Sequence, residues 1–204
     1  MRATWILWLS LAALYAGFRL WYDGGGAPLA PEEVDRYVAI LEERGGEPER
    51  IAAVREFLAN DPGGEFVMAN LIRFRAEPLA VGELPPGESP RQAMDRYMAH
   101  MYPALLRRAC HPVLVGPVVG RALEAWGIQA AEPWSLAGLV RYRSRRDMIE
   151  IATDPAFADA HRYKEAAMDQ TIAVPVEPFF SLASPRWLVA GLLALLGLAL
   201  HRRG

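Results

Sequence analysis

The sequence predicts an α+β fold whose core elements follow one another as strand, helix, strand, strand, helix, strand. The first observation behind this prediction is the segment Glu65 to Arg75, EFVMANLIRFR, which is apolar on both alternating faces of a strand. Such a strand is covered on both sides, so it is expected inside a sheet with helices on one face and a second layer on the other. The second observation is that further strand-like segments alternate with amphipathic helices after it.

The composition is that of a folded domain with apolar appendages. The chain has 204 residues, enough for one compact domain plus extensions, and is 52% hydrophobic with a formal net charge of -2. That charge gives no basis for nucleic-acid binding, so no nucleic-acid partner is expected. The single cysteine, Cys110, excludes an intrachain disulfide and any site of several cysteines. Lys164 is the one lysine among 22 basic residues, a bias more typical of the coding sequence than of a function.

Both ends of the chain are predicted to span a membrane, residues 1–22 as one transmembrane helix and residues 181–204 as a second with a short basic tail. In the first, Thr4 to Tyr22 is almost wholly apolar and reaches ~28 Å at ~1.5 Å per residue. In the second, Trp187 to Leu200 has no polar face. A cleaved signal peptide is the alternative for the first segment.

The charges around these segments predict a two-pass integral membrane protein with membrane lipid as a partner. The terminal tails carry Arg2, Arg202 and Arg203, and such charges tend to stay cytoplasmic. The domain between the two helices is therefore expected to be extracytoplasmic.

Residues 23–63 are predicted to form a linker and a helical hairpin. The glycines after Asp23 make the linker flexible. Pro31 stands at the first position of a helix, acidic residues follow in its first turn, and Gly45-Gly46 closes it. A second helix from Pro48 to Ala59 completes the hairpin, which is interpreted as a covering element or a stalk.

Residues 64–180 are predicted to form the folded domain. Pro117 and Pro175 lack an N–H, which places the second and fourth strands at the sheet edges. Pro103 is expected to kink or interrupt the first long helix. The elements after the first strand are a helix from Pro90 to about Ala109, a strand from Val113 to about Trp126, a strand from Trp134 to Arg143, helices from Arg145 to Thr153 and from Pro155 to Met168, and a strand from Thr171 to Val176. This order is the ferredoxin-like split β-α-β arrangement.

Several segments of this domain occur in an order and at spacings found in a known group of proteins. They are Phe66 to Phe74, Tyr97, Pro103, Trp134 with the following LVRYRSRRDM, Asp154 to Phe157 and Lys164 to Met168. Through them the domain resembles an uncharacterised family, a domain of unknown function, of the dimeric α/β barrel superfamily, which is related to antibiotic-biosynthesis monooxygenases and EthD-like proteins. The resemblance covers roughly Glu65 to Val176.

The resemblance implies that two copies pair their sheets into a barrel and that each subunit has a pocket between its sheet and its helices. A homodimer and a small-molecule ligand are therefore expected as partners. The chain departs from the family at two places: Ala109-Cys110-His111 stands where glycines are usual, and Lys164 stands where an arginine is common.

Five residues are candidates for ligand binding: Asn70, Arg73, His100, Arg121 and His161. A polar side chain inside an apolar strand needs a partner, so Asn70 either binds a ligand or forms an internal hydrogen bond that fixes the packing. The two arginines either bind a carboxylate or enolate, or are solvated. The two histidines either act as bases or have a structural role. Their spacing matches no helical metal pair, so no metal site is expected.

Three functions stay open at the level of the sequence, and so does the question of whether the protein is an enzyme. The first is a membrane-anchored module that binds a small molecule in the pocket. The second is a cofactor-independent monooxygenase or isomerase, in which Asn70 and a nearby histidine or arginine polarise an enolate. The third is a non-catalytic structural membrane protein. No Walker, Rossmann, zinc or nucleophile-elbow spacing occurs, so no cofactor is expected.

Overall fold

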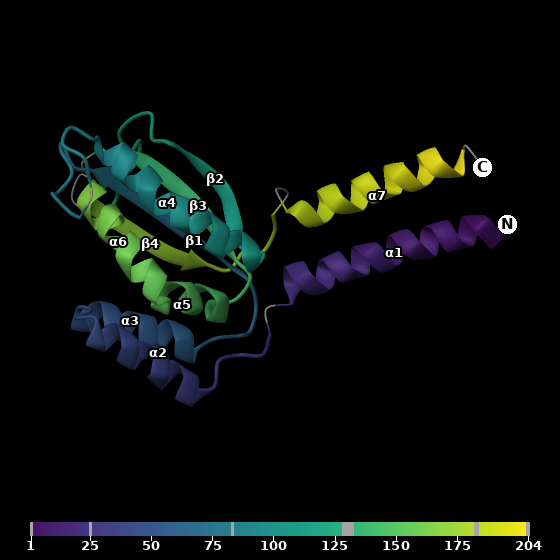
Figure 1. Cartoon of the computed structure of the whole chain (residues 1–204), viewed down its shortest axis with the longest axis horizontal. Helices are drawn as coiled ribbons and strands as arrows, with labels where there is room; N and C mark the ends of the chain where they lie inside the picture. Colours follow the sequence, from purple (N-terminus) through teal and green to yellow (C-terminus); the bar gives the residue numbers. More distant parts are fainter. Residues whose placement is uncertain (1, 25, 83, 128–132, 182–183, 203–204) are drawn as a thin grey trace. The chain divides into compact units, whose positions relative to one another are not determined.

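The computed structural model describes residues 2–24, 26–82, 84–127, 133–181 and 184–202. Within these ranges the chain forms seven helices and four strands (Figure 1). They divide into two compact units. The terminal unit combines Met1–Gly24 with Pro178–Gly204, and the central unit is Gly25–Glu177.

The terminal unit contains two helices, α1 (Arg2–Asp23) and α7 (Pro185–His201), which lie side by side (Figure 1). A glycine allows their close approach, because a Cβ built at Gly197 would lie 2.6 Å from the indole of Trp8. No side chain larger than hydrogen fits there without displacing that ring.

The prediction of transmembrane helices in residues 1–22 and 181–204 is wrong. In the described part of the chain, no helix combines the length and the apolarity needed to cross a membrane. Helix α7 has 17 residues, which span ~26 Å and fall short of a bilayer core. Helix α1 has 22 residues but includes Arg19 and several indole and phenol rings. Three further predictions depend on those helices and are wrong for the same reason: the two-pass topology, the extracytoplasmic domain and membrane lipid as a partner.

The central unit is built on one antiparallel sheet of four strands in the order β2-β3-β1-β4. The strands are β1 (Phe66–Phe74), β2 (His111–Pro117), β3 (Leu136–Tyr142) and β4 (Met168–Val176). Strand β1 lies inside the sheet, and the proline-containing strands β2 and β4 are its edges, because a proline cannot donate to a ladder on both sides. The chain order of strands and helices in this unit is the predicted β-α-β-β-α-β.

One face of the sheet is covered by α4 (Pro90–Arg107) and α6 (Pro155–Ala167), which Figure 1 shows side by side across the strands. Ile72 from β1 and Leu136 from β3 join Tyr97 from α4 in one apolar core. Burial of this core stabilises the unit by roughly 25 cal/mol for each Å² of apolar surface removed from water.

The alternation of side chains along β1 decides which layer each one meets. Ile72 and Phe74 belong to the helix-side core, so Asn70 faces the helices as well. Leu71 points to the other face and is 36% exposed, and its cross-strand neighbour Ile172 is 49% exposed. This second face is apolar and open in the single chain, where the sequence predicts a covering layer.

A smaller core joins the helical hairpin to the rest of the central unit. It forms between α2 (Pro31–Glu43), α3 (Pro48–Ala59) and α5 (Arg145–Thr153). Leu58 from α3 is fully buried and packs in one cluster with Ile149 from α5, which is 1% exposed. The hairpin therefore covers α5, and it also reaches the start of β1, where the rings of Phe57 and Phe66 lie 5.1 Å apart between centroids.

Two elements differ from their predicted form. Helix α4 is not interrupted at Pro103, because this residue and Ala99 both lie on the exposed side, where solvent can reach the carbonyl that loses its partner. Strand β2 ends at Pro117 and not near Trp126, and the residues that follow form a largely exposed loop.

Candidate functional site

The five predicted site residues lie in five separate places. Asn70 is inside the sheet on its helix side, and Arg73 is on the open face. His100 is on α4 and His161 is on α6. Arg121 is in the loop after β2.

Asn70 is half-buried, with Gly138 and Ala173 as its cross-strand neighbours. Its amide nitrogen donates hydrogen bonds to the backbone carbonyls of Met68, at 3.0 Å, and of Gly138, at 3.3 Å. The donor side of the amide is therefore satisfied within the sheet, as expected for a packing role. Among the described residues none donates to Oδ1, so this acceptor is what Asn70 offers to a ligand or to water.

Space is left beside Asn70 on the helix side of the sheet. Gly138 is buried, yet a Cβ built on it would meet no atom within 4 Å. Directly opposed residues of an antiparallel pair point to the same face, so this space adjoins the Asn70 amide. The packing between sheet and helices thus has a small gap next to Oδ1.

The two predicted arginines do not converge on Asn70. Arg73 points from β1 to the open face and forms an ion pair with Asp169 at 2.5 Å. Arg121 is exposed and lies outside every strand. Asn70 and Arg73 are therefore on opposite sides of the sheet and cannot hold one small ligand together.

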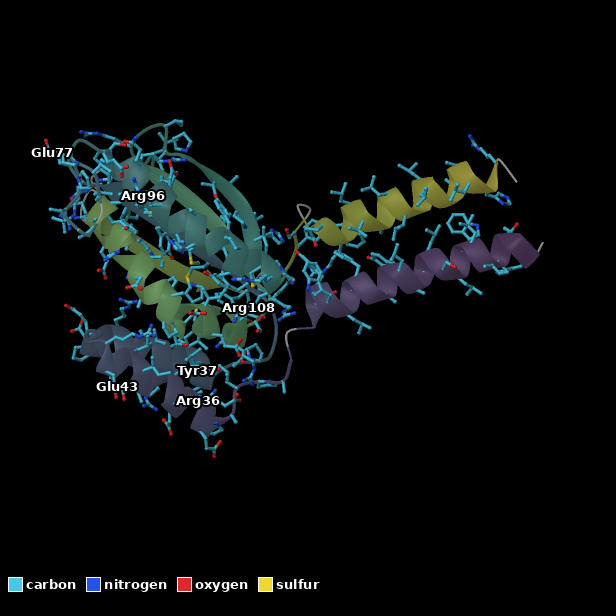
Figure 2. All side chains as sticks on the ribbon, viewed as in Figure 1. Arg36, Tyr37, Glu43, Glu77, Arg96 and Arg108 are labelled. Carbon is cyan, nitrogen blue, oxygen red and sulfur yellow. The ribbon has the colours of Figure 1, made fainter. Side chains whose placement is uncertain are left out.

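His100 lines a hollow of about 110 Å³ between the second half of α4 and the junction of α5 with α6. Arg107 and Arg108 line the same hollow, and Figure 2 labels Arg108 at the end of α4. Arg108 is shared between Glu150, at 3.5 Å, and Asp147, at 4.0 Å. His100 and Arg107 are exposed, and neither forms an ion pair with a carboxylate of the described residues.

The acid in the lining of this hollow, Asp154, already has a structural role. It ends α5 and begins α6, and its Oδ1 accepts the N–H of Ala156 at 2.9 Å. The remaining lining is apolar and consists of Met101, Ala104, Ile151, Ala156 and Phe157. The hollow therefore combines cationic groups at the end of α4 with an apolar wall.

His161 stands one turn after Phe157 on α6 and is not part of the lining of the hollow; the two ring centroids are 5.2 Å apart. Tyr97 from α4 packs edge-on against both rings, 5.9 Å from Phe157 and 6.2 Å from His161 between centroids. A carboxylate oxygen of Glu165 lies 3.1 Å from Nδ1 of His161. Burial lowers the pKa of His161, and the positive charge of Lys164 lowers it further, so the ring is neutral at neutral pH.

Lys164 completes this group of side chains, although it is not among the five predicted site residues. Its ammonium lies 5.7 Å from the centroid of the Tyr97 ring, within the range of a cation–π contact. No carboxylate in the described ranges lies at ion-pairing distance from it. Burial lowers the pKa of Lys164, as does the charge of Arg50 on α3, while Glu165 acts in the opposite direction.

The sequence carried signals for the residues that were missed. Lys164 is the only lysine of the chain and stands three positions after His161, so both project from one side of α6. Arg107 stands seven positions after His100, which likewise places the two on one side of α4.

Other parts of the central unit have fewer features of a binding site than the region around α4 and α6. A wide hollow of about 400 Å³ lies at the hairpin, between the end of α2 and the start of α3, with Glu42 and Arg55 in its lining. No group of three or more metal-ligating side chains occurs in the ranges that the structure describes. The groups with free binding capacity are thus concentrated around α4 and α6.

Comparison with known proteins supports the fold and leaves the function open. No family model matches the chain, and no match is found among curated proteins. A crystal structure of a protein of unknown function from Rhodopseudomonas palustris is 24% identical, with a TM-score of 0.53 over 66% of this chain and 95% of that chain. The methylated form of that protein is also 24% identical, with a TM-score of 0.52 over 67% and 94%.

A more distant structure is that of a dimeric protein of unknown function and ferredoxin-like fold from Bacteroides fragilis. It is 17% identical, with a TM-score of 0.35 over 56% of this chain and 97% of that chain, a likeness too low to support an argument. At these identities the solved structures bear on the fold alone. No family model supports membership in the particular family that the sequence resembles.

Proposed function

We propose that this chain is a small-molecule-binding protein that takes an acidic ligand between α4 and α6. The observation that carries the proposal is the cationic end of α4 at this hollow, where Arg107 forms no ion pair with a carboxylate of the described residues. His100 from the same helix and Phe157 from α6 line the hollow with it. A carboxylate or phosphate would supply the missing charge.

The size of the hollow limits what enters it. A volume of about 110 Å³ holds the equivalent of roughly three or four water molecules, far less than a drug-sized ligand needs. The hollow therefore suits the acidic group of a ligand, while the apolar lining at Met101 and Phe157 suits its carbon skeleton.

The test is the thermal stability of the full chain in the presence of acetate, phosphate or chloride at equal ionic strength. We expect acetate or phosphate to raise the melting temperature more than chloride does, and Arg107→Gln to abolish the difference. Arg91→Gln is the matched control, because Arg91 is on the same helix but pairs with Asp95 at 3.2 Å. Equal melting temperatures in all three salts would refute an anion site.

We further propose that the protein forms a homodimer through the open face of its sheet. The exposed apolar residues of this face run across three strands: Leu71 on β1, Leu114 on β2, and Ile172, Val174 and Val176 on β4. A continuous apolar sheet face of this kind is a binding surface in soluble proteins. A second copy fits because a two-fold interface needs only one self-complementary patch.

The dimer is tested by sedimentation velocity of the full chain over a range of concentrations. The change Val174→Glu places a charge in the middle of the proposed interface, so we expect it to shift the protein to monomers. Leu106→Glu on α4 is the control, since Leu106 is 57% exposed and lies away from the sheet. A dimer that persists in Val174→Glu and is lost in Leu106→Glu would place the interface elsewhere.

The alternative of an isomerase or monooxygenase centred on Asn70 gains no support from the site. Polarising an enolate requires a hydrogen-bond donor, and the N–H groups of the Asn70 amide already donate to the carbonyls of Met68 and Gly138. Arg73 is on the opposite face. The residues that the alternative requires are therefore not assembled.

A further inference from the structure

Lys164 has the surroundings of a reactive amine more than those of a structural cation. A lysine on a protein surface is fully solvated or paired with an acid, and Lys164 is neither. It is half-buried on α6, its ammonium sits over the Tyr97 ring at 5.7 Å, and it has no ion-pairing acid among the described residues. The cation–π contact contributes about 1 kcal/mol, which is less than an ammonium loses on leaving water.

The charged groups that face Lys164 favour its neutral form. Arg50 approaches from α3 and opposes a second positive charge, and the phenol of Tyr97 from α4 stays protonated because burial raises its pKa. On α6 itself, Glu165 is the one group that favours the ammonium, and it is 63% exposed and bonded to His161. A lysine desolvated beside another cation is the usual arrangement of an amine nucleophile.

His161 is placed to move protons for such a nucleophile. It stands one turn before Lys164 on α6, and both lie against the Tyr97 ring. Glu165 holds Nδ1 of its ring at 3.1 Å, so Nε2 is the nitrogen available to take and return a proton.

We propose that Lys164 captures carbonyl compounds as an imine, with His161 as the proton carrier. The neutral amine attacks the carbonyl carbon and forms a C–N bond, and His161 carries the first of the two amine protons to the oxygen, which becomes a hydroxyl. His161 then carries the second proton from the nitrogen to this hydroxyl, and the C–O bond breaks to release water. The product is a C=N bond between ligand and Lys164, with no net oxidation or reduction. The inference rests on the ligand site proposed above and adds that its ligand carries an aldehyde or ketone that reaches Lys164 beyond the lining of the hollow.

The uniqueness of Lys164 makes the test direct. The full chain is incubated at pH 7 with glyoxylate and sodium cyanoborohydride, which reduces an imine to a stable secondary amine, and the modified sites are mapped by mass spectrometry. The α-amino group of the same chain is the internal standard. The measured quantity is the ratio of Lys164 modification to α-amine modification, in native and in guanidinium-unfolded protein.

An unperturbed lysine with a pKa of about 10.4 is neutral in roughly one molecule in 2,500 at pH 7. We therefore expect the ratio to be higher in the native protein than in the unfolded one, because burial and the charge of Arg50 lower the pKa of Lys164 and raise its fraction of neutral amine. A native ratio equal to or below the unfolded ratio overturns the proposal.

Two variants separate reactivity from simple access. Arg50→Gln removes the opposing charge and His161→Gln removes the proton carrier, so both should lower the native ratio several-fold. Arg55→Gln, on the same helix as Arg50 but paired with Asp35, should not. Unchanged ratios in Arg50→Gln and His161→Gln contradict the mechanism. If acetate still stabilises the protein while no imine forms, this inference fails and the anion site stands.

Discussion

Phe157 and His161, one turn apart on α6, hold their rings 5.2 Å apart and both contact the edge of Tyr97 on α4. Phe157 also forms part of the hollow that contains His100 and Arg107. This one ring therefore separates the cationic end of α4 from the histidine and lysine of α6. Two groups of residues far apart in the sequence become neighbours through it.

The stability of the protein should depend on the protonation of His161. Burial lowers its pKa in the folded state below the ordinary value of 6.5, so the unfolded chain takes up the proton first as the pH falls. The contribution of His161 is complete above about pH 6.5 and is lost as the pH falls through the folded pKa. The midpoint of guanidinium unfolding should fall more between pH 8 and pH 5.5 in the wild type than in His161→Gln. Parallel pH dependence in the two proteins would contradict this.

Gly138→Ala should leave the fold intact or stabilise it slightly. A Cβ at this position meets open space, and alanine is favoured over glycine in a strand by about 0.5–1 kcal/mol. Chemical denaturation measures the free energy of unfolding. Gly138→Leu, which fills the gap beside Asn70, distinguishes a ligand space from a packing defect: it should preserve the fold but weaken ligand binding if the ligand extends to Oδ1.

Gly197→Ala should have the opposite effect on the terminal unit. The new Cβ would lie 2.6 Å from the Trp8 indole, and such overpacking typically costs about 1–3 kcal/mol. Hydrogen exchange of the α1 and α7 amides should accelerate, while the strands of the central unit keep their protection. Gly191→Ala on the same helix is the control, because a Cβ there meets nothing within 4 Å.

Arg145→Leu should strongly destabilise the central unit. The guanidinium of Arg145 is buried over the Phe57 ring at 4.2 Å, pairs with Glu177 at 2.8 Å and lies 3.8 Å from the buried carboxylate of Asp61. Removing it leaves a buried charge without its cation, a loss of about 3 kcal/mol in the free energy of unfolding. The exposed ion pair between Arg55 and Asp35 should contribute less than about 1 kcal/mol to the free energy of unfolding.

Cys110 should resist alkylation in the folded protein. It is fully buried, and burial raises the pKa of its thiol to about 11, so roughly one molecule in 1,000 is a thiolate at pH 8. Iodoacetamide should therefore modify Cys110 only after unfolding, as followed by mass spectrometry. Rapid modification of the native protein would show that this side chain is accessible.

The sheet could be predicted from the sequence because its signals are local. The two-sided apolar pattern of Phe66–Phe74 predicts an inner strand, and the prolines at 117 and 175 predict edges; both follow from the geometry of a strand and the missing N–H. The apolar ends were recognised as helices but wrongly assigned to a membrane, because crossing a bilayer takes both length and apolarity and neither helix combines the two.

The candidate site was much harder to predict. Side chains such as Arg73 and Asn70 are three residues apart in the sequence, yet strand alternation sends them to opposite faces. Lys164 is marked in the sequence as the only lysine and Arg107 by its spacing from His100, but what distinguishes both is that neither has an ion-pairing acid among the described residues, which only the structure shows. Phe157 and Tyr97 have the periodicity of core residues, and only the packing of α4 on α6 places them between two cationic groups.

Asp154 is both the C-cap of α5 and the N-cap of α6, so no loop separates the two helices that meet at the hollow. Arg44 binds the final carbonyls of α5 at Ala152 and Thr153 and holds that end in place. Among the described residues, the wall of the site is thus a corner held in place by its caps and by Arg44. A ligand would meet a surface that is already formed, and its rate of association would be set by diffusion and charge and not by a conformational step.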